Sequence, residues 1–196
     1  MPRAPSLPSE ARRLQAVTHL LELASEMPPA LIRTAQIAKR MGLSEAALFR
    51  HFPSKQDLWL ATLEYATTQF WQQVEEAVKP DESPLAGVRS LLMAQLAVNR
   101  RIPGLPPLIF NELQNSAPTP CRAVVDDYLD KLRGRLFELL TMAQADHLLS
   151  ADRSADGLAN TLLALVLGLL LQERIRSSIP GQAEAELETA LQLLLR

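Results

Sequence analysis

A glycine between two short stretches with helical periodicity most constrains how this chain can fold. The first stretch, residues 34–41, opens on Thr34, a good helix cap, and places its apolar residues on one face. Gly42 can adopt the left-handed conformation that a tight turn between helices requires. Ser44 then offers a hydroxyl to cap a second helix over residues 44–51. The spacing therefore predicts a helix-turn-helix.

The second predicted helix leaves small or hydrogen-bonding residues on one side, as expected of a helix that enters a DNA groove. Pro53 ends it, and Ser54 with Asp57 has the spacing of a capping box for a helix that starts at Lys55. A lysine beside the free N–H groups of a helix N-terminus can bind a phosphate. The predicted DNA-binding residues are Thr34, Ser44, Glu45, Ala46, Ala47, Phe49, Arg50, His51 and Lys55. Base contacts are expected of Ser44, Ala46, Ala47 and Arg50, and phosphate contacts of Thr34, His51 and Lys55.

The charge distribution agrees with this local interpretation. The chain has a formal net charge of -2 over 196 residues. Residues 30–58, however, hold five basic and two acidic side chains, which gives +3 there and leaves -5 for the remainder. Contact with a phosphate backbone needs only a local positive face. Ordinary solvated helix charges would give the same count, so charge alone does not decide the matter.

An all-α fold is predicted for the whole chain. The hydrophobic content is 47%, dominated by Leu and Ala, with only 5% aromatic residues. Apolar residues repeat every three or four positions in one segment after another, and proline-rich turns separate several of these segments. The expected helices, about nine, cover residues 9–26, 34–41, 44–51, 55–78, 85–101, 108–115, 121–143, 154–177 and 182–195.

The helix-turn-helix region contains a set of short motifs: Thr34, the run from Ile37 to Arg40, Gly42-Leu43-Ser44, and Leu48-Phe49-Arg50-His51-Phe52 followed by Lys55. On these residues, the region from Ala11 to Leu63 resembles the TetR family of transcription regulators. The family usually has tyrosine where this chain has Phe49, and glycine and threonine where it has Ala46 and Ala47. The resemblance implies a DNA-binding head, here residues 1–58, and a helical effector-binding and dimerisation body, here residues 59–196.

The body is expected to respond to a ligand. The resemblance implies a repressor that a small hydrophobic effector releases from a pseudopalindromic operator. The middle helices could enclose a pocket lined by apolar side chains and a few amides, although helical spacing alone describes an ordinary core equally well. The predicted ligand-binding residues are Leu92, Met93, Gln95, Leu96, Asn99, Ile109, Phe110, Val124 and Tyr128.

An uninterrupted apolar run, residues 162–171, lies inside the penultimate predicted helix. Ten residues are too few to span a bilayer, which requires about 20, so no membrane partner is expected. A helix that is apolar all round must be covered all round, which predicts contact with a second subunit. The predicted dimer-interface residues are Leu162, Leu165, Gly168, Leu169, Leu187, Leu191 and Leu194. A homodimer would place two recognition helices in successive major grooves of double-stranded DNA.

Other classes of function lack support in the sequence. The three histidines are dispersed, and the chain has no HExxH, GxSxG or glycine-rich phosphate loop, so we expect no enzyme, metal site or cofactor. A single cysteine favours a reducing, cytoplasmic location. One alternative stays open within the same family: the run from Ser44 to Lys55 also looks like the nucleoid-occlusion branch, whose members bind DNA and a cell-division protein.

Overall fold

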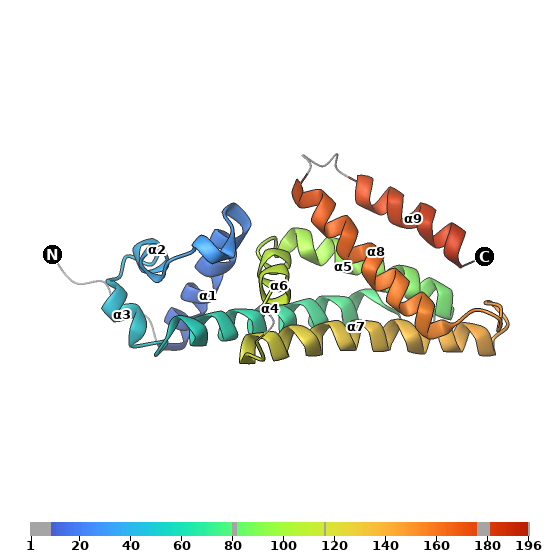
Figure 1. The fold of residues 1–196 in the computed structure, drawn as a ribbon, viewed down its shortest axis with the longest axis horizontal. Helices are drawn as coiled ribbons and strands as arrows, with labels where there is room; N and C mark the ends of the chain where they lie inside the picture. Colours follow the sequence, from blue (N-terminus) through green and yellow to red (C-terminus); the bar gives the residue numbers. More distant parts are fainter. Residues whose placement is uncertain (1–8, 80–81, 116, 176–180, 196) are drawn as a thin grey trace. The chain divides into compact units, whose positions relative to one another are not determined.

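The computed structural model describes residues 9–79, 82–115, 117–175 and 181–195, and these residues form helices and connecting turns without a strand (Figure 1). This confirms the predicted all-α class. The helices are α1 (Ser9–Glu26), the short 3-10 helix η1 (Pro29–Leu31), α2 (Thr34–Arg40), α3 (Glu45–Phe49), α4 (Lys55–Ala77), α5 (Pro84–Arg101), α6 (Leu105–Leu113), α7 (Pro120–Ala145), α8 (Ala155–Ile175) and α9 (Gln182–Leu194).

The chain divides into two compact units. The head unit contains the residues up to Thr67 together with Ile102–Val125, and the body unit contains Thr68–Arg101 together with the residues from Asp126 onward. Helices α4 and α7 therefore each begin in the head unit and end in the body unit. The predicted division into functional domains at residue 58 stays a prediction.

The turn between α2 and α3 has the conformation that the sequence predicts. Gly42 has a φ of 66°, in the left-handed region that favours glycine. The Ser44 hydroxyl accepts a hydrogen bond from the backbone N–H of Ala47 at 3.2 Å and so caps α3. Leu48 is 1% exposed and packs into the head core. Local turn and capping chemistry therefore fixes the second helix relative to the first.

The start of α6 differs from the prediction. We expected the prolines after Ile102 to interrupt the chain until Leu108, but α6 begins at Leu105 with prolines in its first turn. Proline is tolerated there because the first N–H groups of a helix have no partner within it. Gly104 caps this helix, and a Cβ atom added to Gly104 would lie 2.0 Å from the backbone oxygen of Leu21. The start of α6 therefore lies directly against the backbone of α1.

The head unit also buries the single cysteine. Cys121, at the start of α7, is 3% exposed. Burial raises the pKa of its thiol to about 11, and the carboxylates of Glu112 and Glu64 add to the increase. A protonated, buried thiol is a core residue, as expected of a small hydrophobic side chain.

The body unit is built from α5, α8 and α9 together with the later parts of α4 and α7. Helices α8 and α9 lie side by side, and both pack on α5 (Figure 1). Helix α8 is long and apolar enough, by length and composition alone, to cross a membrane, which the ten-residue run did not suggest. Only 33% of its most apolar 18-residue window is buried within the chain. Most of the apolar surface of α8 is therefore not covered within one chain.

Candidate nucleic-acid interface

Helix α3 exposes one side and buries the other. Glu45, Ala46, Phe49 and Arg50 are exposed, and Ser44 at the cap is exposed as well. The apolar side rests on α2, which α3 contacts extensively (Figure 1). An exposed helix face that a neighbouring helix holds at a fixed angle is the arrangement that a helix-turn-helix uses to enter the major groove.

Two predicted contact residues are placed differently from the expectation. Ala47 is only 8% exposed, so it faces the head core rather than the groove and has little surface for a base. Thr34 is the first residue of α2 rather than its cap, and it is 9% exposed. Its hydroxyl donates a hydrogen bond to the carboxylate of Glu45 across the turn. The Thr34 side chain therefore joins α2 to α3, and the Ala47 side chain is part of the head core. The local sequence pattern does not distinguish these roles from DNA contact.

Three cations on this part of the head are unpaired. Arg33, Lys39 and Arg50 are exposed, and their side chains make no hydrogen bond or ion pair with any residue that the structure describes. Lys39 lies in the last turn of α2, and Arg50 follows α3. Unpaired cations beside a recognition helix are suited to phosphate oxygens and base edges. Arg33 and Lys39 were not among the predicted contacts, although the local charge count included them.

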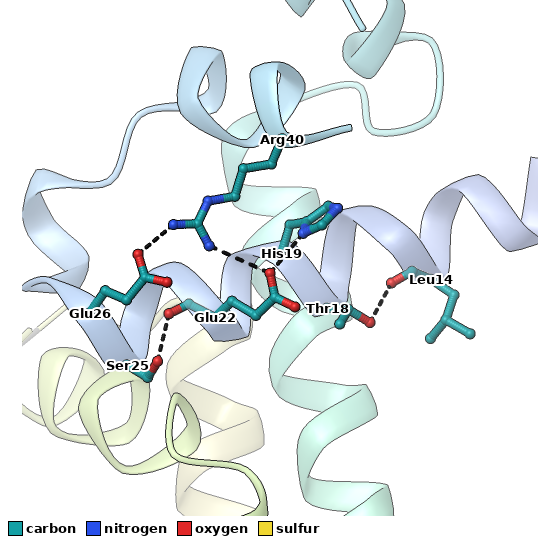
Figure 2. Close-up of polar contacts among 7 residues, drawn as sticks. All are labelled: Leu14, Thr18, His19, Glu22, Ser25, Glu26 and Arg40. Carbon is teal, nitrogen blue, oxygen red and sulfur yellow. Dashed lines mark hydrogen bonds and ion pairs between the residues drawn. The ribbon is translucent and has the colours of Figure 1, made fainter. Parts of the chain in front are cut away.

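Arg40 has a structural role instead. Its guanidinium bonds the carboxylate of Glu26 and lies 3.4 Å from that of Glu22, both on α1 (Figure 2). The hydrogen bond with Glu26 raises the pKa of Arg40, and the same bond lowers the pKa of Glu26. The Nδ1 atom of His19 lies within hydrogen-bond distance, 2.8 Å, of the Glu22 carboxylate in the same cluster (Figure 2). The ion pairs tie the end of α2 to α1, so this arginine is not available to DNA in this conformation.

Lys55 begins α4, as predicted. The backbone N–H of Asp57 donates a capping hydrogen bond to the Ser54 hydroxyl at 3.1 Å, and that hydroxyl donates to the Asp57 carboxylate at 2.7 Å. The Lys55 ammonium donates to the backbone oxygen of Ile32 at 2.8 Å and lies 4.5 Å from the centre of the Trp59 ring. Partial burial lowers the pKa of this ammonium. Lys55 therefore joins α4 to the loop before α2. A phosphate bound by the Lys55 ammonium would lie close to both elements.

A further residue positions the end of the recognition helix. Arg13 on α1 donates a hydrogen bond to the backbone oxygen of His51, and its guanidinium lies 4.3 Å from the centre of the Phe52 ring. His51 itself is half-buried. Sequence reasoning missed Arg13 because its partner is 38 residues away and is a backbone atom.

The predicted ligand-binding residues are divided between the units. In the body unit, Met93 is half-buried, and the buried members are Leu92, Gln95, Leu96, Asn99 and Tyr128. In the head unit, Ile109 is buried, and Phe110 and Val124 are half-buried. None of the nine lines the groove of about 840 Å³ that the body unit contains. That groove lies along other residues of α4, α5 and α7 and was not predicted.

The predicted dimer-interface residues also fall into two groups. The members that are buried within the body unit, and so offer little surface to a partner, are Leu162, Leu169, Leu187 and Leu191. The half-buried members are Leu165, Gly168 and Leu194. Three large apolar residues outside the predicted set are more exposed: Leu171 at 42%, Ile175 at 71% and Leu193 at 66%.

The capped turn, the exposed side of α3 and the free cations around it define a helix-turn-helix DNA-binding protein. Residues 21–62 match the family described as "Bacterial regulatory proteins, tetR family". Residues 21–62 therefore carry the DNA-binding region of the TetR family of transcription regulators.

Comparison with individual proteins agrees with this assignment. A nucleoid occlusion factor SlmA from Marinomonas sp. (strain MWYL1) is 26% identical over 157 residues, 80% of each chain. A putative TetR-family transcriptional regulator from Rhodococcus sp. has the same fold, with a TM-score of 0.81 and 19% identity over 95% of this chain and 100% of that one. AibR, solved with isovaleryl coenzyme A and operator DNA, gives a TM-score of 0.74 and 18% identity over 94% and 98%.

Proposed function

We propose that this protein is a transcriptional repressor that binds a pseudopalindromic operator as a homodimer and is released by a small hydrophobic effector. The observation that carries the proposal is the exposed side of α3, where Arg50 has no partner within the described residues. An arginine in this position can bind a guanine edge through two hydrogen bonds. Occupying a promoter in this way is enough to repress transcription.

Dimerisation through α8 and α9 is supported by their surface. Ile175 and Leu193 are 71% and 66% exposed, and the most apolar window of α8 is largely uncovered within one chain. A Cβ atom added to Gly168 would have no atom within 4 Å, so a helix of another subunit could approach closely there. Burial of this surface against a second copy would give a twofold dimer, the commonest closed assembly.

Release by an effector requires two conformations. A ligand lowers DNA affinity only if it binds the DNA-incompetent conformation more tightly. Helices α4 and α7 begin in the head unit and end in the body unit, so a change in the body can act on the head through either helix. A fold relative, AibR, was solved with both isovaleryl coenzyme A and operator DNA, which supports a small-molecule effector as a class.

The test begins with selection of bound fragments from the organism's genomic DNA by the purified protein. We expect a few promoter fragments that share an inverted repeat, and a solution mass of twice 21.7 kDa with and without this DNA. A monomer, or fragments without an inverted repeat, would contradict the proposal.

A second candidate function has one observation in its favour. The Marinomonas relative is a nucleoid occlusion factor, and it matches over 80% of both chains rather than over the head alone. A protein of that kind would bind many sites dispersed over the chromosome. The distribution of bound fragments therefore decides between the two functions.

Replacing Lys55 with alanine tests the phosphate assignment. We expect weaker binding to every DNA sequence, and a slope of log affinity against log salt that falls by about one, because one fewer counterion is released. The measurement is fluorescence anisotropy with operator and unrelated DNA over a salt series. Lys79→Ala, at an exposed lysine of the body unit, is the matched control and should leave the slope unchanged. An unaltered slope in Lys55→Ala would remove the assignment.

A further inference from the structure

The exposed side of the recognition helix carries one acidic side chain. This side is formed by Glu45, Ala46, Phe49 and Arg50. Ala47 and Leu48, between them, are 8% and 1% exposed and face the head core. Three of the four exposed residues are small, apolar or cationic, which suits a surface that meets DNA. Glu45 is different, because a carboxylate at this surface is repelled by the phosphates on either side of a groove.

The charge of Glu45 is not neutralised by the protein. Glu22 and Glu26, the acidic residues of α1 that face α2, both pair with Arg40. Glu45 has no such ion pair among the residues that the structure describes, although Arg50 lies at the other end of the same helix. The negative charge is therefore available to a hydrogen-bond donor from outside the chain.

The Thr34 hydroxyl holds this carboxylate in place. It donates a hydrogen bond to Oε1 of Glu45 across the turn, and Thr34 itself is 9% exposed at the first residue of α2. Oε2, the second carboxylate oxygen, makes no hydrogen bond with any residue that the structure describes. A side chain that is already fixed loses less conformational entropy on binding. One oxygen of Glu45 is thus positioned, and the other is open to a donor.

Few groups on DNA can donate to a carboxylate. In the major groove, the donors on the bases are the N4 amino group of cytosine and the N6 amino group of adenine. Adenine also presents its N7 acceptor beside the amino group, and guanine and thymine present acceptors, all of which repel a carboxylate. Cytosine is therefore the base whose edge matches Glu45.

Glu45 and Arg50 are close enough to read one half-site. Five residues of α-helix rise by about 7.5 Å and base pairs stack about 3.4 Å apart, so the two side chains reach base pairs within about three steps of each other. Arg50 matches the acceptor edge of guanine, and Glu45 matches the donor of cytosine. The two residues therefore select complementary features of the same half-site.

We propose that Glu45 determines specificity for a cytosine in each half-site by accepting a hydrogen bond from its N4 amino group, and that Thr34 positions the carboxylate for this contact. The inference rests on the proposed function, because it names what one residue of the recognition helix reads in the operator. It also gives Thr34 a part in recognition without contact to DNA.

Selection of bound duplexes from a random-sequence library by the full chain tests the base identity. We expect the parent protein to select two invariant G·C pairs within about three steps, one read through guanine by Arg50 and one through cytosine by Glu45. Glu45→Gln should select adenine in place of that cytosine, because a glutamine amide matches N6 and N7 of adenine. Glu64→Gln, at an exposed carboxylate of α4 in the head unit, is the matched control and should still select cytosine.

An operator with N4-methylcytosine at the selected position tests the amino group itself. In a duplex, the remaining N4–H pairs with guanine, and the methyl group replaces the hydrogen that faces the major groove. We expect the parent protein to bind this operator about tenfold more weakly in fluorescence anisotropy, as loss of one hydrogen bond to a charged group would give. Glu45→Ala lacks the acceptor and should bind the methylated and unmethylated operators equally.

Thr34→Val removes the hydroxyl and keeps the shape of the side chain, so it tests the positioning role. We expect it still to select cytosine, and its preference for the unmethylated operator to fall by about threefold. Thr34→Ser keeps the hydroxyl and should retain the full preference. A purely structural role for Thr34 would weaken binding to both operators equally, which distinguishes the two roles.

Selection of the same base by the parent protein and Glu45→Gln, or equal binding of the parent to both operators, would overturn the assignment. A Glu45 side chain that only stabilises the start of α3 would give this result, with a lower melting temperature for Glu45→Gln. A chain that selects no DNA sequence contradicts the proposed function as well. A chain that selects an inverted repeat, without the change from cytosine to adenine, contradicts this assignment alone.

Discussion

Gly104→Ala is expected to lower the melting temperature of the protein by about 5 to 10 °C, the largest stability change that we anticipate from a single methyl group. The new Cβ atom would lie 2.0 Å from the backbone oxygen of Leu21 and 2.7 Å from its carbonyl carbon. Backbone atoms of a packed helix cannot move aside as a flexible side chain can. Helix α6 would have to shift away from α1, with the loss of the contacts between them.

Gly134→Ala provides the matched control for this experiment. Gly134 lies in the interior of α7, and a Cβ atom there has no atom within 4 Å. Alanine is the better helix former, so this variant should unfold at the same temperature or slightly higher, by up to about 1 kcal/mol of stability. Circular dichroism melts of the two variants and the parent protein supply the comparison. Equal melting temperatures for both variants would show that α6 does not rest on α1 as described.

Arg50→Ala is expected to weaken binding to the selected operator by about 10- to 100-fold, as the loss of a bidentate contact to guanine would. Binding to unrelated DNA should fall much less. The Arg50 side chain has no partner in the described residues, so the melting temperature should not change. Fluorescence anisotropy with operator and unrelated DNA measures both affinities.

Arg50→Lys separates geometry from charge. A lysine keeps the positive charge but cannot make two parallel hydrogen bonds, so it should retain binding to unrelated DNA and lose most of the preference for the operator. If Arg50→Lys kept the full preference for the operator over unrelated DNA, Arg50 would be a phosphate contact rather than a base contact.

Local features of this chain could be predicted from sequence, and features that depend on distant partners could not. Gly42 and Ser44 act within a few residues of their own positions, and the structure confirms both. Thr34 and Ala47 follow the same local pattern, but the packing of α2 on α3 buries them. Periodicity gives the helical face of a residue and not the element that covers that face.

The same limit applies to the body. Leu187 and Leu193 are both leucines of α9, yet Leu187 is fully buried and Leu193 is 66% exposed. The groove beside Trp71 is formed by three helices, so no single segment contains its signature. The amides of Gln95 and Asn99 were predicted as ligand contacts, and that assignment stays a prediction. The burial of both side chains became visible only with the packed structure.

The residues that join the helices of the head are different from most of the residues on its outward surface. Arg40, Thr34 and Arg13 join the helices, whereas Ala46 and Arg50 have no part in these contacts. Substitutions at these two outward positions can accordingly alter the preferred DNA sequence with little penalty to folding. During evolution, duplicated copies of such a gene could acquire new targets in a few steps while the scaffold remained intact.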